Sequence, residues 1–246
     1  MKGTFTIIVA LGFIIILILC DTLFFQKNNI TPLSSPAVKL EDGISQKIIK
    51  SETDILLLDV RYPQTTNVAI NSMIESFITK QVDDYKLQIA ESPMIENLKN
   101  SMYGRYITSF FPNNIVSFVF TIAEMNSGAA HPNPVIFTKT YDLKLNKELT
   151  LVDVFKPDSD YINKISALAI PNIISNLPLE QVDNTWVTEG AGPVAENYQN
   201  FTVNEEGMTF YFSPYQVAPY ATGTREVHLF WSELYNMLLP PFDSAL

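Results

Sequence analysis

The side chains best suited to catalysis or metal binding are a histidine in residues 126–134 and the carboxylates near it in the sequence. His131 lies in that segment, and Glu124 and Asp142 flank it in the sequence. A histidine with carboxylates can act as general acid and base, or can bind a metal. The chain has only one other histidine, His228, and no HExxH motif, so this grouping alone predicts neither chemistry. A structural role, in which the His131 ring caps its own loop, is favoured over a catalytic one.

Other catalytic and cofactor-binding motifs are missing from the sequence. A serine nucleophile is typically presented on a GxSxG turn, and phosphate-binding loops contain GxGxxG or GxxxxGK. None of these patterns occurs here, and the single cysteine, Cys20, lies in the apolar N-terminal run. No thiolate is therefore left for a metal site in the rest of the chain. We predict no catalytic residue, no metal and no cofactor, and we expect that the protein is not an enzyme.

Residues 210–223, FYFSPYQVAPYATG, are rich in tyrosine and proline. They place Tyr211, Tyr215 and Tyr220 around Pro214 and Pro219. Tyrosine rings are rigid and amphipathic, and a loop fixed by proline can present them as a surface for stacking on sugars or for contacting a protein. The alternative is that these rings only close one edge of the hydrophobic core. The segment is the strongest candidate for a binding site that the residues alone provide.

Composition and charge exclude several classes of partner. The 246 residues are 47% hydrophobic and 17% charged, which is typical of a chain with a packed core. The net charge is −10, and residues 1–25 contribute nothing to it because Lys2 and Asp21 cancel. Nucleic acid and anionic lipid surfaces both require clustered cations, so neither is an expected partner. Basic proteins and neutral sugars remain possible partners.

The N-terminus is expected to cross a membrane. Residues 4–20 are uncharged and apolar, and with the apolar residues up to 25 they would span about 33 Å as a helix, enough for a bilayer core of about 30 Å. A cleaved signal would need small residues before its cleavage site, and a lipoprotein signal would need a small residue before Cys20, where Leu19 stands. We therefore favour an uncleaved transmembrane signal anchor in residues 1–25, followed by a linker in residues 26–50.

The hydrophobic pattern of the remaining chain predicts a mixture of strands and helices. The clearest element is an amphipathic helix over residues 67–91, and the second is a helix that begins at Asp158 or Ser159 and is kinked or broken near residues 167–170 by Pro171. Residues 178–200 have weak periodicity and are expected to be irregular. Strands are predicted at residues 53–62, 103–111, 115–125, 135–143, 201–203, 208–213 and 225–230, with a short strand and helical turn at 149–155 and a terminal helix at 231–238.

These elements predict an α+β fold. We expect an antiparallel sheet with two main helices packed on one face, preceded by the transmembrane helix. The domain organisation that follows has an N-terminal α+β subdomain in residues 51–126 and a C-terminal subdomain in residues 127–246, packed together as one unit.

Three segments also resemble a known family. Residues 127–133, SGAAHPN, resemble the GGAHPN or GGAHGN loop of a family of bacterial extracytoplasmic domains, and residues 208–223, MTFYFSPYQVAPYATG, resemble its FYFNPYEIAPYAAG signature. Residues 56–78 resemble the partner domain, in which a strand ends in Tyr-Pro and a helix begins near Ile-Asn. The order of helices and strands agrees over about residues 50–236. The family is the RsiV-like and PdaC-type domain, found in lysozyme-sensing anti-sigma factors and in peptidoglycan deacetylase proteins.

The resemblance implies an α+β fold and a binding role, for lysozyme in the anti-sigma factors and for cell-wall glycan in the deacetylases. Two features differ from the family pattern. Ala129 replaces the second glycine of the loop, and we expect neither a sigma-binding segment nor a deacetylase domain, so anti-sigma signalling and deacetylation are not expected. The loop and the signature together give the predicted binding residues, which are His131, Pro132, Asn133, Tyr211, Tyr215 and Tyr220.

The sequence thus predicts a membrane-anchored, single-pass protein whose domain lies on the extracytoplasmic side. Its expected function is to bind or sense a ligand of the cell envelope, either peptidoglycan glycan or a lysozyme-like protein. One alternative is a cell-wall hydrolase or deacetylase that uses His131 and the nearby carboxylates. Another is a structural envelope component that pairs with a second membrane protein.

Overall fold

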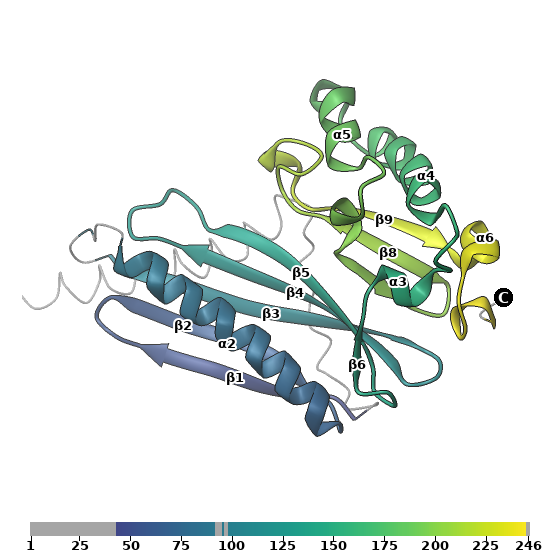
Figure 1. The fold of residues 1–246 in the computed structure, drawn as a ribbon. Helices are drawn as coiled ribbons and strands as arrows, with labels where there is room; N and C mark the ends of the chain where they lie inside the picture. Colours follow the sequence, from purple (N-terminus) through teal and green to yellow (C-terminus); the bar gives the residue numbers. More distant parts are fainter. Residues whose placement is uncertain (1–42, 92–94, 96–97, 245–246) are drawn as a thin grey trace, which may run out of the picture.

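The structure is a computed structural model that describes residues 43–91, 95 and 98–244. Nine strands form two sheets in this part of the chain (Figure 1). The large sheet has the order β1-β2-β3-β4-β5-β6 and is antiparallel except for the parallel pair β2–β3, and the small sheet β7-β8-β9 is antiparallel. The strands are β1 (Ser45–Glu52), β2 (Leu56–Gln64), β3 (Asn100–Phe111), β4 (Ile115–Met125), β5 (Asn133–Asp142), β6 (Lys147–Leu149), β7 (Phe201–Val203), β8 (Gly207–Phe212) and β9 (Arg225–Phe230).

One long helix covers one face of the large sheet. Helix α2 (Val68–Ala90) confirms the helix predicted over residues 67–91, and the Asn67 side chain caps it by accepting a hydrogen bond from the Ile70 N–H at 3.1 Å. Its apolar stripe packs on alternate side chains of β4, whose other side chains point to the opposite face. The buried residues of this contact include Ile70, Ile74, Ile78, Val82, Tyr85 and Ile89 from α2, and Val116, Phe118, Phe120 and Ile122 from β4.

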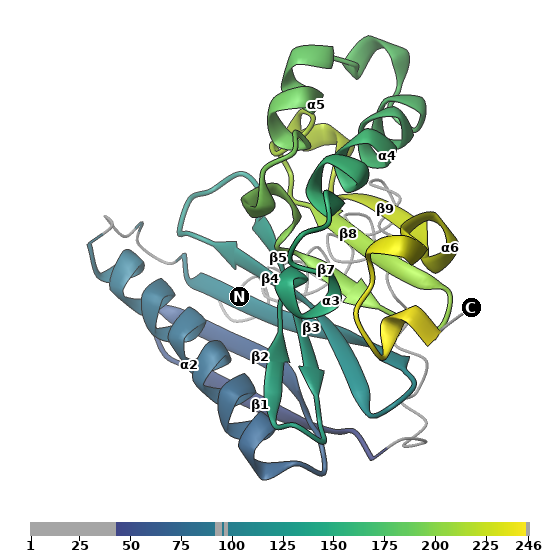
Figure 2. The same cartoon turned by 45° about the vertical axis from the view of Figure 1, so that its right-hand side comes forward.

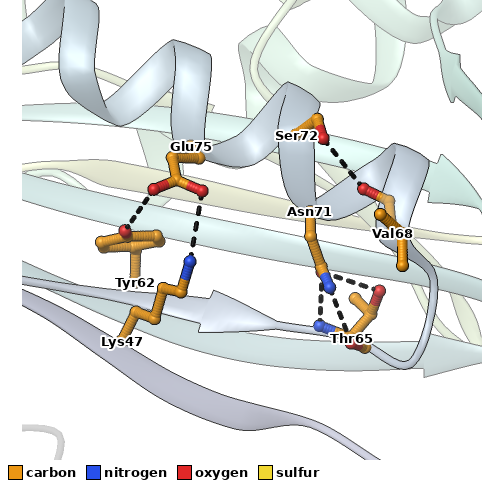
Figure 3. A network of polar contacts seen from close by, with 7 residues as sticks. All are labelled: Lys47, Tyr62, Thr65, Val68, Asn71, Ser72 and Glu75. Atoms are coloured by element: carbon orange, nitrogen blue, oxygen red, sulfur yellow. Dashed lines mark hydrogen bonds and ion pairs between the residues drawn. The ribbon is translucent and has the colours of Figure 1, made fainter.

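Polar contacts attach α2 to the strands at the edge of the large sheet (Figure 3). The Asn71 carboxamide accepts from the Thr65 backbone N–H at 2.7 Å and donates to the Thr65 carbonyl at 2.9 Å, which closes the turn between β2 and α2. Glu75 bonds Lys47 of β1 at 3.2 Å and accepts from the Tyr62 hydroxyl at 3.5 Å. The edge strand β1 is therefore held by side chains as well as by its pairing with β2.

The second half of the chain builds a separate layer around the small sheet (Figure 2). Helix α4 (Tyr161–Ser175) packs against β9, and the short helices α3 (Leu151–Val154), α5 (Asn184–Gly190) and α6 (Trp231–Leu234) complete the layer. Helix α4 continues through Pro171 without the predicted break, because the buried side chains of Ala169 and Ile173 on either side hold that turn against the core. Helix α5 lies in the segment expected to be irregular.

Side-chain hydroxyls join the two layers. Strand β7 lies on the face of the large sheet opposite α2, and its outer backbone groups have no strand partner in the described structure. The Ser117 hydroxyl of β4 accepts from the Val203 N–H at 3.1 Å and bonds the Thr140 hydroxyl at 2.8 Å, while Ser109 donates to the Val203 carbonyl at 3.2 Å. These bonds satisfy buried polar groups of β7 that would otherwise be unpaired.

The α+β class is confirmed, but the expected single sheet with two helices on one face is wrong. There are two sheets, with α2 on the large one and α4 on the small one, so the two helices lie in different layers. The parallel β2–β3 pair also differs from the expected antiparallel order. Helix α2 connects these two strands, and a crossover of this kind returns the chain in the same direction.

The N-terminal predictions have different outcomes. The linker expected in residues 26–50 is wrong at its end, because residues 45–52 form β1 and pair with β2 along its length. The transmembrane anchor of residues 1–25 lies outside the described residues and stays a prediction. In the part that the structure describes, no helix is long and apolar enough to cross a membrane. The large sheet runs from residue 45 to 149, across the boundary at 126, and the two-subdomain division stays a prediction.

Candidate functional site

Three aromatic rings from two distant segments form a continuous surface strip, which we call the aromatic strip: His131, Tyr220 and Tyr215. The His131 ring stacks on Tyr220 with 4.7 Å between centroids and 25° between planes. Tyr220 then meets Tyr215 at 5.6 Å and 34°. His131 and Tyr215 are exposed, and Tyr220 between them is half-buried. The fold therefore brings together three of the six predicted binding residues as one stack.

The strip is tied to the backbone at both ends. The Tyr220 hydroxyl donates to the Pro132 carbonyl at 3.0 Å, and the His131 Nδ1 lies 3.0 Å from the same oxygen. At the other end the Trp186 Nε1–H donates to the Tyr215 carbonyl at 2.9 Å. Burial, followed by the neighbouring Tyr215, raises the pKa of the Tyr220 hydroxyl, so this hydroxyl stays protonated and available as a donor. The rings are held in place before any ligand arrives.

The loop that carries Tyr215 is positioned by a glutamine. The Gln216 carboxamide accepts from the Ser213 N–H at 3.2 Å and donates to the carbonyls of Gly190 and Asn197, each at 3.0 Å. A side chain at Gly190 would lie 1.8 Å from the Gln216 carbonyl, so this close approach requires glycine. Tyr215 itself has φ +70, a conformation that few residues with a side chain adopt, and it is 59% exposed. The backbone of Tyr215 is therefore strained, although its side chain faces solvent.

The loop that carries His131 is also anchored to the fold. The Asn100 side chain accepts from the Ser127 N–H at 2.8 Å, and the Ser127 hydroxyl accepts from the Ile95 N–H at 3.0 Å. Gly128 has φ +82, which favours glycine at the first position of the family loop. Ala129, where the family pattern has its second glycine, is not among the positive-φ residues of the described structure. Alanine is therefore compatible with this backbone.

The other predicted binding residues lie differently. Pro132 supplies its carbonyl to Tyr220, whereas Asn133 begins β5 and is exposed opposite Glu124 of β4. Tyr211 is outside the strip: it lies between the layers, packed with Val119 and Ile136 and only 8% exposed. Burial raises the pKa of Tyr211 to about 12. Its place in the fold is that of a core residue.

The two carboxylates proposed for catalysis lie at opposite ends of the β4–β5 hairpin, and only Glu124 is at the end that carries His131. Asp142 lies at the far end of β5, where its side chain accepts the N–H groups of Lys144 and Leu145 at 2.8 Å each. Glu124 lies at the same end of the β4–β5 hairpin as His131, and burial, followed by Asp84, raises its pKa. No group of three histidine, cysteine or acidic residues able to hold a metal ion occurs in the described part of the chain.

Sequence reasoning missed Trp186 and Gln216 as supports of the strip. Trp186 lies on α5, within the segment expected to be irregular, yet a capping signal was present. The Asp183 side chain accepts from the Thr185 and Trp186 N–H groups at 2.9 and 3.1 Å, which is the usual pattern of an aspartate before a helix. The contact of Gln216 with Gly190 has no local signal, because the two residues are 26 positions apart.

A groove of about 680 Å³ lies beside the strip. It follows the outer edge of β5 and is closed on the other side by residues of the second layer, including Ala195, Asn200, Ser213 and Gln216. Residues 131–140 and 213–220 each contribute both to the strip and to the groove. Gln216, the sequence neighbour of Tyr215, lines the groove, whereas the three rings of the strip do not.

Comparison with known proteins finds similarity to a peptidoglycan deacetylase and to a mycobacterial immunogenic protein. The chain is 28% identical over 180 residues to the peptidoglycan-N-acetylmuramic acid deacetylase PdaC of Bacillus subtilis, covering 73% of this chain and 38% of PdaC. It is 25% identical over 148 residues to the immunogenic protein MPT64 of Mycobacterium tuberculosis, covering 60% of this chain and 61% of MPT64. The chain thus spans less than two thirds of the length of either curated relative.

Two solved structures share the fold. A DUF3298 family protein from Pseudomonas aeruginosa has a TM-score of 0.58 at 14% identity, with 82% of this chain and 98% of that chain covered. A member of the same family from Bacteroides fragilis has a TM-score of 0.57 at 14% identity, with 82% and 96% covered. Residues 152–232 match the family described as protein of unknown function DUF3298. These findings confirm the resemblance to the PdaC-type domain.

Proposed function

We propose that this protein is a membrane-anchored, extracytoplasmic module that binds cell-wall glycan without modifying it. The observation that carries the proposal is the aromatic strip, in which the exposed rings of His131 and Tyr215 lie on either side of Tyr220, with centroids 4.7 and 5.6 Å from it. Rings of this kind stack on the apolar C–H faces of sugars, and their fixed positions reduce the entropy lost on binding. The similarity to a peptidoglycan deacetylase supports glycan as the ligand class.

Several features favour binding over catalysis. Asp142 is directed to its own turn at the opposite end of β5, and His131 is stacked on Tyr220 with Nδ1 beside a carbonyl. A general base must lie within hydrogen-bond reach of its substrate and, in most sites, of a group that orients it. The 38% of PdaC that the chain covers is too small a share to transfer the activity of the whole protein.

The test is calorimetric titration with the disaccharide N-acetylglucosaminyl-N-acetylmuramic acid at two salt concentrations. The carboxylate of the muramic acid and the protein's net charge of −10 repel each other, so we expect binding that does not weaken as salt screens this repulsion. Tyr215→Ala is expected to weaken it roughly two- to tenfold, the usual range for one aromatic contact. Tyr235→Ala, which changes a tyrosine 51% exposed on another part of the surface, is the control. Equal affinity of the wild-type protein and Tyr215→Ala for the disaccharide would exclude the aromatic strip as its binding site.

A second candidate is a basic protein such as lysozyme. The net charge of −10 supports it, because an acidic surface attracts a cationic partner from a distance. The same titration with lysozyme distinguishes the two. Lysozyme binding that weakens with salt, together with no response to the disaccharide, would replace the glycan proposal by this one.

A further inference from the structure

Strands β1, β2 and β3 have one face that α2 does not cover (Figure 1). Lys47 of β1 and Tyr62 of β2 point toward α2 (Figure 3). Because side chains alternate along a strand, residues an odd number of positions away point to the opposite face. That face therefore carries Lys50 of β1, which stands directly opposite Asp59 of β2 in the strand register, and Arg61 two residues further along β2.

Two of the three arginines in the chain lie on this face and are fixed by one carboxylate. The Arg61 Nε–H donates to the Asp59 Oδ1 at 3.1 Å, and the Nη1–H of Arg105 on β3 donates to the same oxygen at 2.8 Å. Arg105 also donates to the backbone carbonyls of Asp59 and Gly104, at 3.0 and 2.7 Å. The two guanidinium groups are thus held beside each other before any ligand binds.

Both arginines keep donors that no described residue uses. Arg61 makes its contacts through Nε alone and Arg105 through Nη1 alone, so the remaining N–H groups of each guanidinium have no partner in the described part of the chain. The two side chains are 41% and 46% exposed. A guanidinium presents its N–H groups as a planar fork, which matches the oxygens of a phosphate or a carboxylate.

The surroundings make this face positive in an acidic protein. Lys50 is exposed beside Asp59, and Lys99, the residue before β3, bonds Glu52 of β1 at 2.9 Å. With the two arginines, the face carries four cations and two carboxylates, whereas the whole chain has a net charge of −10. We call these four cations and their two carboxylates the cationic face. Residues 50–105 contribute them, and only the pairing of three strands gathers them.

We propose that the cationic face binds the phosphate groups of an anionic polymer of the cell envelope. A phosphodiester keeps two unesterified oxygens, which adjacent guanidinium forks can share. A polymer chain fits better than an anionic bilayer, because a bilayer would repel the rest of the acidic molecule, whereas a single chain contacts this face alone. The inference goes beyond the proposed function, since no ring of the aromatic strip lies on β1, β2 or β3.

The experiment titrates the full-length protein, held in nanodiscs of zwitterionic phosphatidylcholine, with three probes. They are an oligomer of glycerol phosphate, an uncharged polyglycerol of the same length, and vesicles of phosphatidylglycerol. We expect the oligomer alone to bind, with an affinity that falls as salt rises. Absence of oligomer binding, or equal binding of the polyglycerol, would overturn the proposal. Vesicle binding without oligomer binding would assign the face to a lipid surface instead.

A matched pair of double variants tests the arginines. Arg61→Gln/Arg105→Gln removes both forks, and Lys80→Gln/Lys86→Gln removes the same charge from α2, where each lysine is also paired with an aspartate. Loss of two exposed ionic contacts should weaken oligomer binding roughly three- to thirtyfold in the arginine variant. Its affinity should also depend less steeply on salt. The lysine variant should bind like the wild-type protein, and an equal loss in both would contradict the proposal.

Nuclear magnetic resonance of the arginine side chains provides a test that needs no variant. The Nε–H signals of Arg61 and Arg105 should shift when the oligomer is added to the wild-type protein. Arg225, whose Nε–H donates to the Thr224 carbonyl at 3.2 Å, is the internal control and should not shift. Unchanged signals of the first two arginines would refute the site. Tyr215→Ala should leave oligomer affinity unaltered, and a loss there would place the polymer on the aromatic strip instead.

Discussion

Removing the Ser117 hydroxyl should weaken the junction between the two layers. Ser117 is fully buried, accepts from the Val203 N–H at 3.1 Å and bonds the Thr140 hydroxyl at 2.8 Å. In Ser117→Ala, Thr140 can still donate to the Phe201 carbonyl at 3.4 Å, but the Val203 N–H loses its acceptor. One buried donor without a partner costs about 1–3 kcal/mol of unfolding free energy.

The assay is equilibrium urea unfolding followed by tryptophan fluorescence in a Trp186→Phe background. Trp231 then reports alone, and it is buried beside β7 with its Nε1–H bonded to the Asn204 carbonyl at 2.9 Å. With a denaturant slope of about 2 kcal/mol per M, the midpoint should fall by about 0.5–1.5 M. Ser109→Ala is the matched control. It removes a donor to the Val203 carbonyl, and an under-satisfied carbonyl is better tolerated, so its cost should stay below about 1 kcal/mol. An unchanged midpoint in Ser117→Ala, or an equal loss in Ser109→Ala, would refute this account of the junction.

Three further predictions concern the site and its surroundings. Gly190→Ala places a methyl group against the Gln216 carbonyl, so it should lower thermal stability and shift the Trp186 emission as the Tyr215 loop moves; an unshifted spectrum would argue against that contact. Burial raises the pKa of Tyr211 to about 12, so the stability tied to its neutral form is complete below pH 10 and is lost as pH rises through 12. The difference between the ultraviolet titration curves of the wild-type protein and Tyr211→Phe should therefore show ionisation of Tyr211 at high pH. A midpoint near 10 would place this ring at the surface. Burial raises the pKa of Asp59, but hydrogen bonds and positive charge from Arg61 and Arg105 outweigh burial and lower this pKa overall. The stability that Asp59 contributes is therefore present above about pH 4 and is lost as pH falls through the lowered pKa. Asp59→Asn should flatten the acid limb of stability against pH, and an unaltered limb would exclude this pair of contacts.

Local elements could be predicted because their signals are local. The helix α2 follows from apolar residues at helical spacing after a capping asparagine. The β3–β4 hairpin follows from two alternating runs around Asn113 and Asn114, which adopt φ of +68 and +66 in the turn. Asparagine tolerates this conformation better than most residues, so the turn could be located from the sequence.

The division into two layers could not be predicted, because it depends on contacts between distant segments. Both faces of strand β8 are covered, so the consecutive residues Phe210, Tyr211 and Phe212 are all buried. The sequence of this strand therefore has no alternation of apolar and polar residues that would indicate an exposed face. For the same reason, the sequence could not show that Tyr211 is buried whereas Tyr215 is exposed. The stack of His131 on Tyr220 joins residues 89 positions apart, and only the family resemblance linked their segments beforehand.

The central claim is that the aromatic strip holds cell-wall glycan, and retention on purified, insoluble peptidoglycan tests it most directly. The measurement compares the wild-type protein with the Tyr215→Ala/Tyr220→Ala double variant and with the Tyr235→Ala control, after circular dichroism has shown that all three are folded. The account predicts that the wild-type protein and the control are retained and that the double variant passes into the unbound fraction. Equal retention of all three proteins, or no retention of the wild-type protein, would contradict it.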